Sequence, residues 1–108
     1  MGAALVALAV AVALGAANLA AWMRGERRRA LILAHLAFGV GGVALFYFAL
    51  PAAADYPVRF AERVALGLFA VAIVTGLAAP RLGNGALTAH LSCAVIAFFI
   101  ALALRGQF

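Results

Sequence analysis

Residues 2–50 read GAALVALAVAVALGAANLAAWM at 2–23, RGERRR at 24–29 and ALILAHLAFGVGGVALFYFAL at 30–50. Each apolar block is close to the ~20 residues that a helix needs to cross the hydrocarbon core of a bilayer. The polar segment between them holds four arginines and one glutamate, which do not belong in lipid. This stretch therefore predicts two membrane-spanning helices joined by a short, charged connection.

The rest of the chain repeats this alternation. Two more apolar blocks follow, and proline and glycine interrupt the chain between the blocks. The sequence predicts an all-α membrane protein, a four-helix antiparallel transmembrane bundle that forms a single domain over residues 1–108. The predicted helices cover approximately residues 2–23, 30–50, 60–79 and 85–104.

The composition excludes most soluble functions. Of the 108 residues, 69% are hydrophobic and 10% are charged, whereas about half of a soluble domain is apolar. All eight basic residues are arginines in or beside the gaps between apolar blocks, so the net charge of +5 indicates membrane topology and not nucleic-acid binding. The lone Cys93 rules out a disulfide framework and a four-cysteine metal site. The lipid bilayer is the expected partner.

The arginines also predict an orientation. The first and third connections hold five arginines and one acid, whereas the second connection and the C-terminal tail hold three arginines and two acids. Because positive loops stay on the cytoplasmic side, both termini are expected on the outer side. Arginine without lysine is typical of GC-rich bacterial genomes, so we expect an integral protein of a bacterial inner membrane.

Two segments of the chain resemble each other. ALTAHL at 86–91 echoes LILAHL at 31–36, and each copy contains one of the two histidines, His35 and His90. This similarity indicates a tandem two-helix repeat. In such a repeat the second and fourth helices run parallel, and their histidines lie at the same depth.

His35 and His90 are the strongest candidates for chemistry. Each lies six residues beyond the polar residue that precedes its block, which places both roughly 9 Å inside the same interface at 1.5 Å per residue. Ionisable groups within a bilayer are costly and usually functional. Two neutral imidazoles on opposite walls form the axial ligand set of a low-spin haem iron, so both residues are predicted metal ligands.

Small residues accompany both histidines. They follow each histidine at i+4 and i+7 on its own helix, and glycines occur near the same level on the first and third helices. Such residues leave a slot for a flat cofactor, although they also let transmembrane helices pack closely around a histidine that merely bonds a neighbouring carbonyl. The predicted cofactor-binding residues are His35, His90, Gly15, Gly39, Gly42, Gly76 and Ala94.

With these residues the chain resembles the four-helix membrane b-type cytochromes, including the cytochrome b core and the haem-bearing anchors of succinate dehydrogenase-like complexes. The resemblance implies one haem b near the arginine-rich side, with its propionates near arginines from 27–29 or Arg81. Many cytochrome b cores hold a second haem on histidines farther along the ligand helices. Here those places fall near Phe48 and Leu104, so at most one haem is implied.

The sequence is compatible with three functions. The first is electron transfer by a one-haem membrane protein or subunit, with quinone as a candidate partner. The second is a cofactor-free accessory subunit that docks on other membrane subunits or on copies of itself. Transport is the weakest, because no membrane-embedded carboxylate or lysine is expected to couple it to ions. The sequence favours an electron-transfer or accessory subunit over a free-standing enzyme.

Two other groups of residues are weaker candidates for binding sites. Asp55 and Glu62 lie near Arg59 and Arg63 in the sequence, where solvated ion pairs are a better interpretation than a quinol site. Cys93 lies one turn from His90, where packing is a better interpretation than a copper or zinc site.

Overall fold

The computed structural model describes residues 1–107 of the chain and confirms the predicted all-α class, with no strand in that range. All four long helices are long and apolar enough to cross a membrane. They are α1 (Gly2–Met23), α2 (Arg29–Ala49), α3 (Val58–Leu82) and α4 (Asn84–Leu104), and the short 3₁₀ helix η1 (Arg105–Gln107) follows α4.

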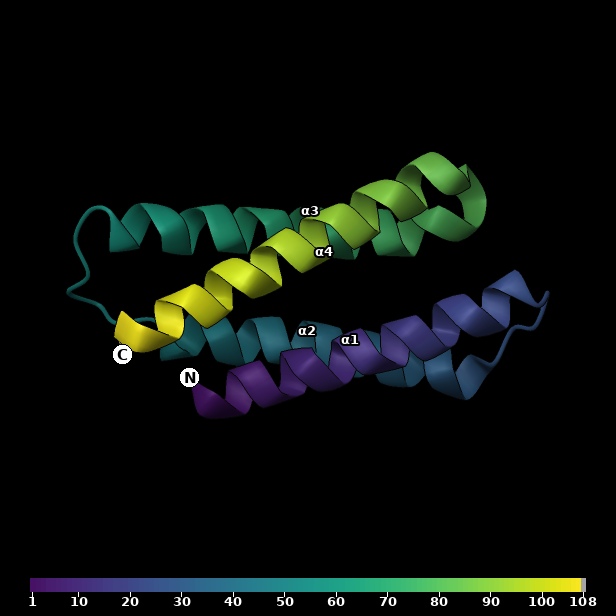
Figure 1. Ribbon diagram of the computed structural model, residues 1–108, viewed down its shortest axis with the longest axis horizontal. Coiled ribbons are helices and arrows are strands. Elements are labelled where there is room, and N and C mark those ends of the chain that lie inside the picture. Colours follow the sequence, from purple (N-terminus) through teal and green to yellow (C-terminus); the bar gives the residue numbers. More distant parts are fainter. Residues whose placement is uncertain (108) are drawn as a thin grey trace. The chain divides into compact units, whose positions relative to one another are not determined.

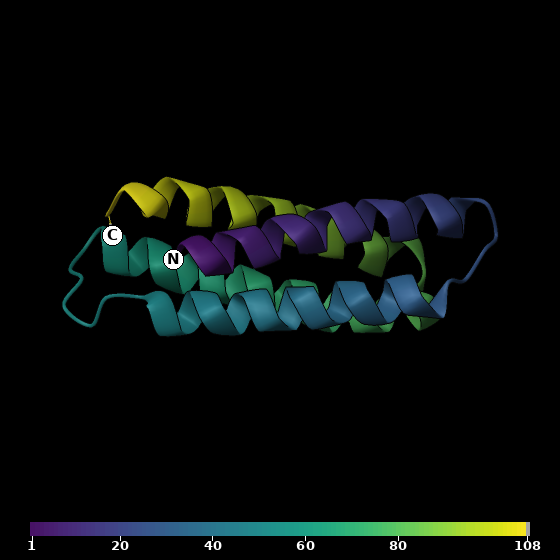
Figure 2. The same ribbon diagram turned by 90° about the horizontal axis from the view of Figure 1, so that it is seen from below.

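The helices form two compact units. In the N-terminal hairpin, residues 1–49, α1 packs against α2, and in the C-terminal hairpin, from residue 50 onward, α3 packs against α4. Within each hairpin the two helices lie side by side and antiparallel in both views (Figures 1 and 2). The two-unit division falls between the two copies of the predicted repeat.

A glycine turn closes the N-terminal hairpin. Gly25 has a φ of +75°, a conformation that glycine adopts without strain. Its N–H donates to the carbonyl of Trp22, and the N–H of Glu26 donates to the carbonyl of Ala21, each at 2.9 Å. These two bonds form a Schellman motif, which satisfies carbonyls at the end of α1. The chain then enters α2 at Arg29, one residue before the predicted start.

The turn of the C-terminal hairpin is shorter than predicted. We expected α3 to end at residue 79 and residues 80–84 to form a connection, but α3 continues through Pro80 to Leu82, and only Gly83 separates it from α4. A proline in the last turn removes only one helical N–H, the one that would bond the carbonyl of Gly76. Gly83, with a φ of +83°, then ends the helix, and its N–H donates to the carbonyl of Ala79 at 2.9 Å.

The start of α3 corrects a second expectation. The helix begins at Val58, two residues earlier than predicted, and Glu62 in its second turn is only 1% exposed. Its carboxylate forms an ion pair with Arg59, with 3.4 Å between Oε2 and Nη1. The expectation of a solvated ion pair is therefore wrong for Glu62.

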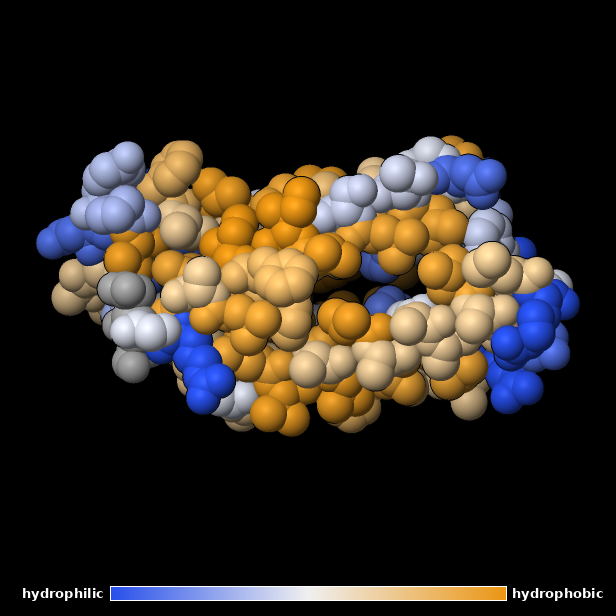
Figure 3. All heavy atoms as spheres, viewed as in Figure 1, coloured by the Kyte–Doolittle hydropathy of each residue, from blue (hydrophilic) through white to orange (hydrophobic). Residues whose placement is uncertain are grey.

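Small side chains let the helices of a hairpin approach closely. A Cβ added at Gly42 of α2 would lie 2.8 Å from Cδ2 and 3.2 Å from the main-chain nitrogen of Leu8 on α1. Such close approach at glycine is the usual way in which membrane helices gain packing energy. Many large apolar side chains remain exposed along the helices, and Figure 3 shows this apolar surface in orange between hydrophilic helix ends. This distribution suits a lipid environment.

Candidate functional site

The N-terminal hairpin fixes His35 through a main-chain carbonyl. His35 lies on α2, and its Nδ1 is 2.8 Å from the carbonyl oxygen of Ala11 on α1. A carbonyl oxygen can only accept, so Nδ1 must carry the proton and donate it. In a neutral imidazole the lone pair is then on Nε2, the tautomer that commonly ligates metals.

Gly15 makes room for this ring. It lies one helical turn beyond Ala11 on α1, directly beneath the imidazole. A Cβ added at Gly15 would be 2.8 Å from Cε1 and 3.2 Å from Nδ1 of His35. Any side chain at this position would push the ring away from the carbonyl that it bonds.

The C-terminal hairpin repeats the arrangement. His90 lies on α4, and its Nδ1 donates to the carbonyl of Ala72 on α3 at 2.6 Å. A Cβ added at Gly76, one turn beyond Ala72, would lie 2.7 Å from Nδ1 and 2.8 Å from Cε1 of His90. Each hairpin therefore contains the same three-part unit, which we call the carbonyl–histidine–glycine unit: Ala11, His35 and Gly15 in one hairpin, and Ala72, His90 and Gly76 in the other.

The equivalence extends along the first helix of each hairpin. Residues 4–17 and 65–78, which are 61 positions apart, are identical at seven of fourteen positions. The burial matches as well, because the buried set Ala4, Leu8 and Ala11 corresponds to the buried set Ala65, Phe69 and Ala72. On the second helices, His35 and His90 each lie six residues beyond the first helical residue. This longer match is visible in the sequence itself.

The structure gives the predicted small residues different surroundings. Gly15 and Gly76, which we expected to leave a slot for a flat cofactor, make room for imidazole rings of their own hairpins. Gly42 makes room for α1, whereas an added Cβ at Gly39 would meet nothing within 4 Å. Ala94, one turn beyond His90, is partly buried.

Other polar residues near the histidines have local roles. Thr75 donates its hydroxyl to the carbonyl of Val71 at 2.7 Å, and Cys93 is partly buried with a free thiol. Among residues 1–107, no group of three or more His, Cys, Asp or Glu side chains could hold a metal ion. The described residues therefore offer no three-ligand site that joins Cys93 to the histidines.

Comparison with known proteins adds no relative. No protein-family model matches the chain, and neither the curated proteins nor the solved structures give a significant match.

The histidine is the reactive part of each carbonyl–histidine–glycine unit. A half-buried imidazole in the Nδ1–H tautomer, held by a carbonyl that cannot rotate away, presents Nε2 in a fixed direction. Outer hydrogen bonds of this kind orient metal-ligating histidines and raise their basicity. The same geometry also forms a stable interhelical contact by itself.

Proposed function

We propose that this chain is a membrane electron-transfer protein, or the electron-transfer subunit of a larger membrane complex, that binds one haem b through His35 and His90. One observation carries the proposal: each hairpin holds one imidazole by the same carbonyl–histidine–glycine unit, at the same position along its helix. One haem held by two histidines would need one such imidazole from each hairpin.

The tautomer of each histidine supports ligation. The carbonyls of Ala11 and Ala72 hold His35 and His90 in the tautomer that ligation requires, so neither ring has to change its protonation pattern to bind a metal. Gly15 and Gly76 leave the room that the rings occupy. When bound, haem would supply a one-electron redox centre, and a membrane quinol or a partner subunit would be the electron source.

The arginines support a bacterial inner-membrane location with both termini outside. The residues between α1 and α2 include three consecutive arginines, 27–29, and Arg81 lies at the equivalent end of the C-terminal hairpin. Both histidines are nearer to these arginine-rich helix ends than to the opposite ones. Under the positive-inside rule this end faces the cytoplasm, and its arginines are the candidates to pair with haem propionates.

A second function is favoured by a different observation. The imidazoles fill the space above Gly15 and Gly76 and are already hydrogen-bonded, which makes each hairpin well packed without any cofactor. On that basis the chain would be an accessory subunit that docks on other membrane helices. Such a subunit should leave the membrane in a complex of fixed stoichiometry.

Absorption spectroscopy separates the two. The purified protein, titrated with hemin in detergent, should give sharp b-type bands in a reduced-minus-oxidised spectrum. His35→Ala and His90→Ala should each abolish the low-spin bands, whereas Cys93→Ala, a control one turn from His90 on α4, should retain them. A protein that takes up no hemin, or whose spectrum does not depend on either histidine, would refute ligation.

A further inference from the structure

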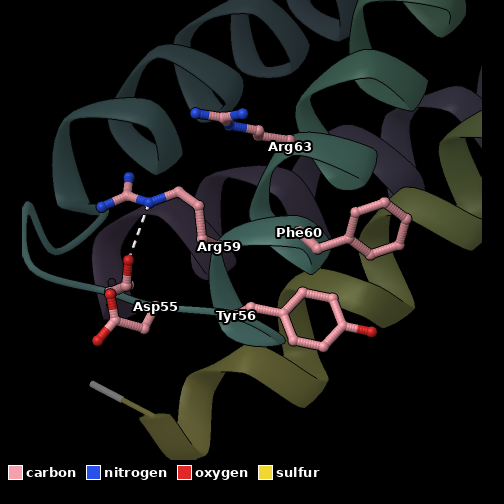
Figure 4. Close-up of a pocket in the computed structure, with 6 residues that line it drawn as sticks. Asp55, Tyr56, Arg59, Phe60 and Arg63 are labelled. Carbon is pink, nitrogen blue, oxygen red and sulfur yellow. Dashed lines mark hydrogen bonds between the residues drawn. The ribbon is translucent and has the colours of Figure 1, made fainter.

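The outer end of α3 contains a hollow that the proposed electron-transfer site does not use. Its volume is about 290 Å³, and it lies between the connection that enters α3 and the first two turns of that helix. Figure 4 shows its polar and aromatic side chains, which extend to opposite sides of the helix. It is lined by Ala54, Asp55, Tyr56, Arg59, Phe60 and Arg63.

Arg59 is fully engaged in holding this region together. Its Nε donates to the carbonyl of Ala54 at 3.1 Å, and its Nη2 donates to the carbonyls of Ala52 at 2.6 Å and Pro51 at 3.3 Å. Its Nη1 forms the ion pair with the buried carboxylate of Glu62. The charge of Arg59 is therefore neutralised within the protein, and its donors fix the shape of the hollow.

Asp55 and Arg63 are the remaining charges. Both are exposed, and within the part of the chain that the structure describes neither side chain forms an ion pair or a hydrogen bond. The hollow thus offers one uncompensated carboxylate and one uncompensated guanidinium. Arg63 can bind a phosphate, and Asp55 can accept hydrogen bonds from an ammonium group.

The position of these charges matches the polarity of a lipid. Asp55 precedes α3, whereas Arg63 lies two turns further along, immediately before the apolar run that begins at Val64. The exposed rings of Tyr56 and Phe60, with 6.2 Å between their centroids, extend to the other side of the helix (Figure 4). Aromatic side chains of this kind gather at the membrane–water interface.

We propose that this hollow binds the headgroup of a zwitterionic phospholipid of the phosphatidylethanolamine type. The phosphate would contact Arg63, and the primary ammonium would contact Asp55. In such a lipid the ammonium lies on the water side of the phosphate, which is the order of Asp55 and Arg63 in the protein.

The charge pattern separates this lipid from the common alternatives. A choline headgroup has no N–H to donate to Asp55. A phosphatidylglycerol headgroup has no cation, so its net negative charge would face the Asp55 carboxylate. The ethanolamine headgroup alone among the three complements both charges with hydrogen bonds.

Lipid retention tests the proposal without reference to haem. The full-length protein is equilibrated in detergent with equal amounts of phosphatidylethanolamine, phosphatidylcholine and phosphatidylglycerol, and the retained lipids are counted by native mass spectrometry. We expect retention of phosphatidylethanolamine to exceed that of each competitor by about threefold, the factor expected for one interfacial ion pair worth about 0.7 kcal/mol.

Three variants make the outcome specific. Asp55→Asn should remove the preference for phosphatidylethanolamine, and Arg63→Gln should lower retention of all three lipids. Arg105→Gln, which removes an exposed arginine that does not line the hollow, should change neither. Circular dichroism should show unchanged helix content, because all three side chains are exposed. Equal retention of the three lipids by the wild-type protein, or a preference that survives Asp55→Asn, would overturn the proposal.

Discussion

Replacing Gly76 with alanine should destabilise the C-terminal hairpin through a clash with one ring. The added Cβ would lie 2.7 Å from Nδ1 and 2.8 Å from Cε1 of His90, closer than carbon atoms pack. The imidazole is rigid, so the whole ring has to move. That movement lengthens or breaks the 2.6 Å hydrogen bond between Nδ1 and the carbonyl of Ala72.

The expected magnitude combines three effects of different sign. Overpacking a close contact costs about 1–3 kcal/mol, and loss of the hydrogen bond costs about 1 kcal/mol. Alanine recovers about 1 kcal/mol of helix propensity relative to glycine. We therefore expect Gly76→Ala to lower the free energy of unfolding by about 1–3 kcal/mol, measured by titration with a denaturing detergent and followed by far-ultraviolet circular dichroism.

Gly67→Ala is the matched control. Gly67 lies on the same helix, but a Cβ added there would meet nothing within 4 Å, so this variant should be as stable as the wild-type protein or slightly more stable. In a double-mutant cycle, His90→Ala should remove most of the cost of Gly76→Ala, because the clashing ring is absent. The reasoning is refuted if Gly76→Ala is as stable as Gly67→Ala, or if its cost persists without the ring.

Four further substitutions test contacts of the two hairpins by the same unfolding titration. Gly15→Ala should destabilise the protein by about 1–3 kcal/mol, because the equivalent clash occurs in the N-terminal hairpin. Gly42→Ala should cost about 1–2 kcal/mol, since the added Cβ meets the main chain of Leu8 as well as its side chain, and a cost near zero would show that the helices lie farther apart. Arg59→Gln should cost about 3 kcal/mol because it leaves the buried carboxylate of Glu62 without its ion-pair partner. Glu62→Gln should cost less than about 1 kcal/mol, because Arg59 keeps its three carbonyl acceptors, and equal costs for these two variants would contradict this account.

The existence of the helices could be predicted from the sequence because each apolar block has the length of a membrane span. The helix ends were harder to predict. Proline usually breaks a helix, yet Pro80 lies in the last turn of α3, where it removes only one helical hydrogen bond. Gly83 then ends the helix, two residues after Arg81. The burial of Glu62 could not be predicted, because charge usually marks a solvated connection and the spacing to Arg59 does not show that the carboxylate is only 1% exposed.

The candidate site was predictable only in part. The two histidines and their glycines stand out in the sequence because they are rare or repeated. The acceptors could not be found in the same way, since Ala11 and Ala72 act through main-chain carbonyls and every residue of a helix has one. Which carbonyl faces the ring depends on the rotation of one helix against the other, and that rotation is set by packing along the whole hairpin.

The differences between the two hairpins indicate what the site requires. Leu8 and Gly42 form a contact in the N-terminal hairpin, whereas the equivalent positions hold Phe69 and Ala97, which are both buried. The size of core residues has therefore changed between the copies, as expected where only the filled volume matters. The carbonyl–histidine–glycine unit is the same in both, although many residues could fill its space. The presence of the same imidazole, carbonyl and glycine in both hairpins, where the neighbouring core residues differ, is the reason to test for a metal ligand before a purely structural role.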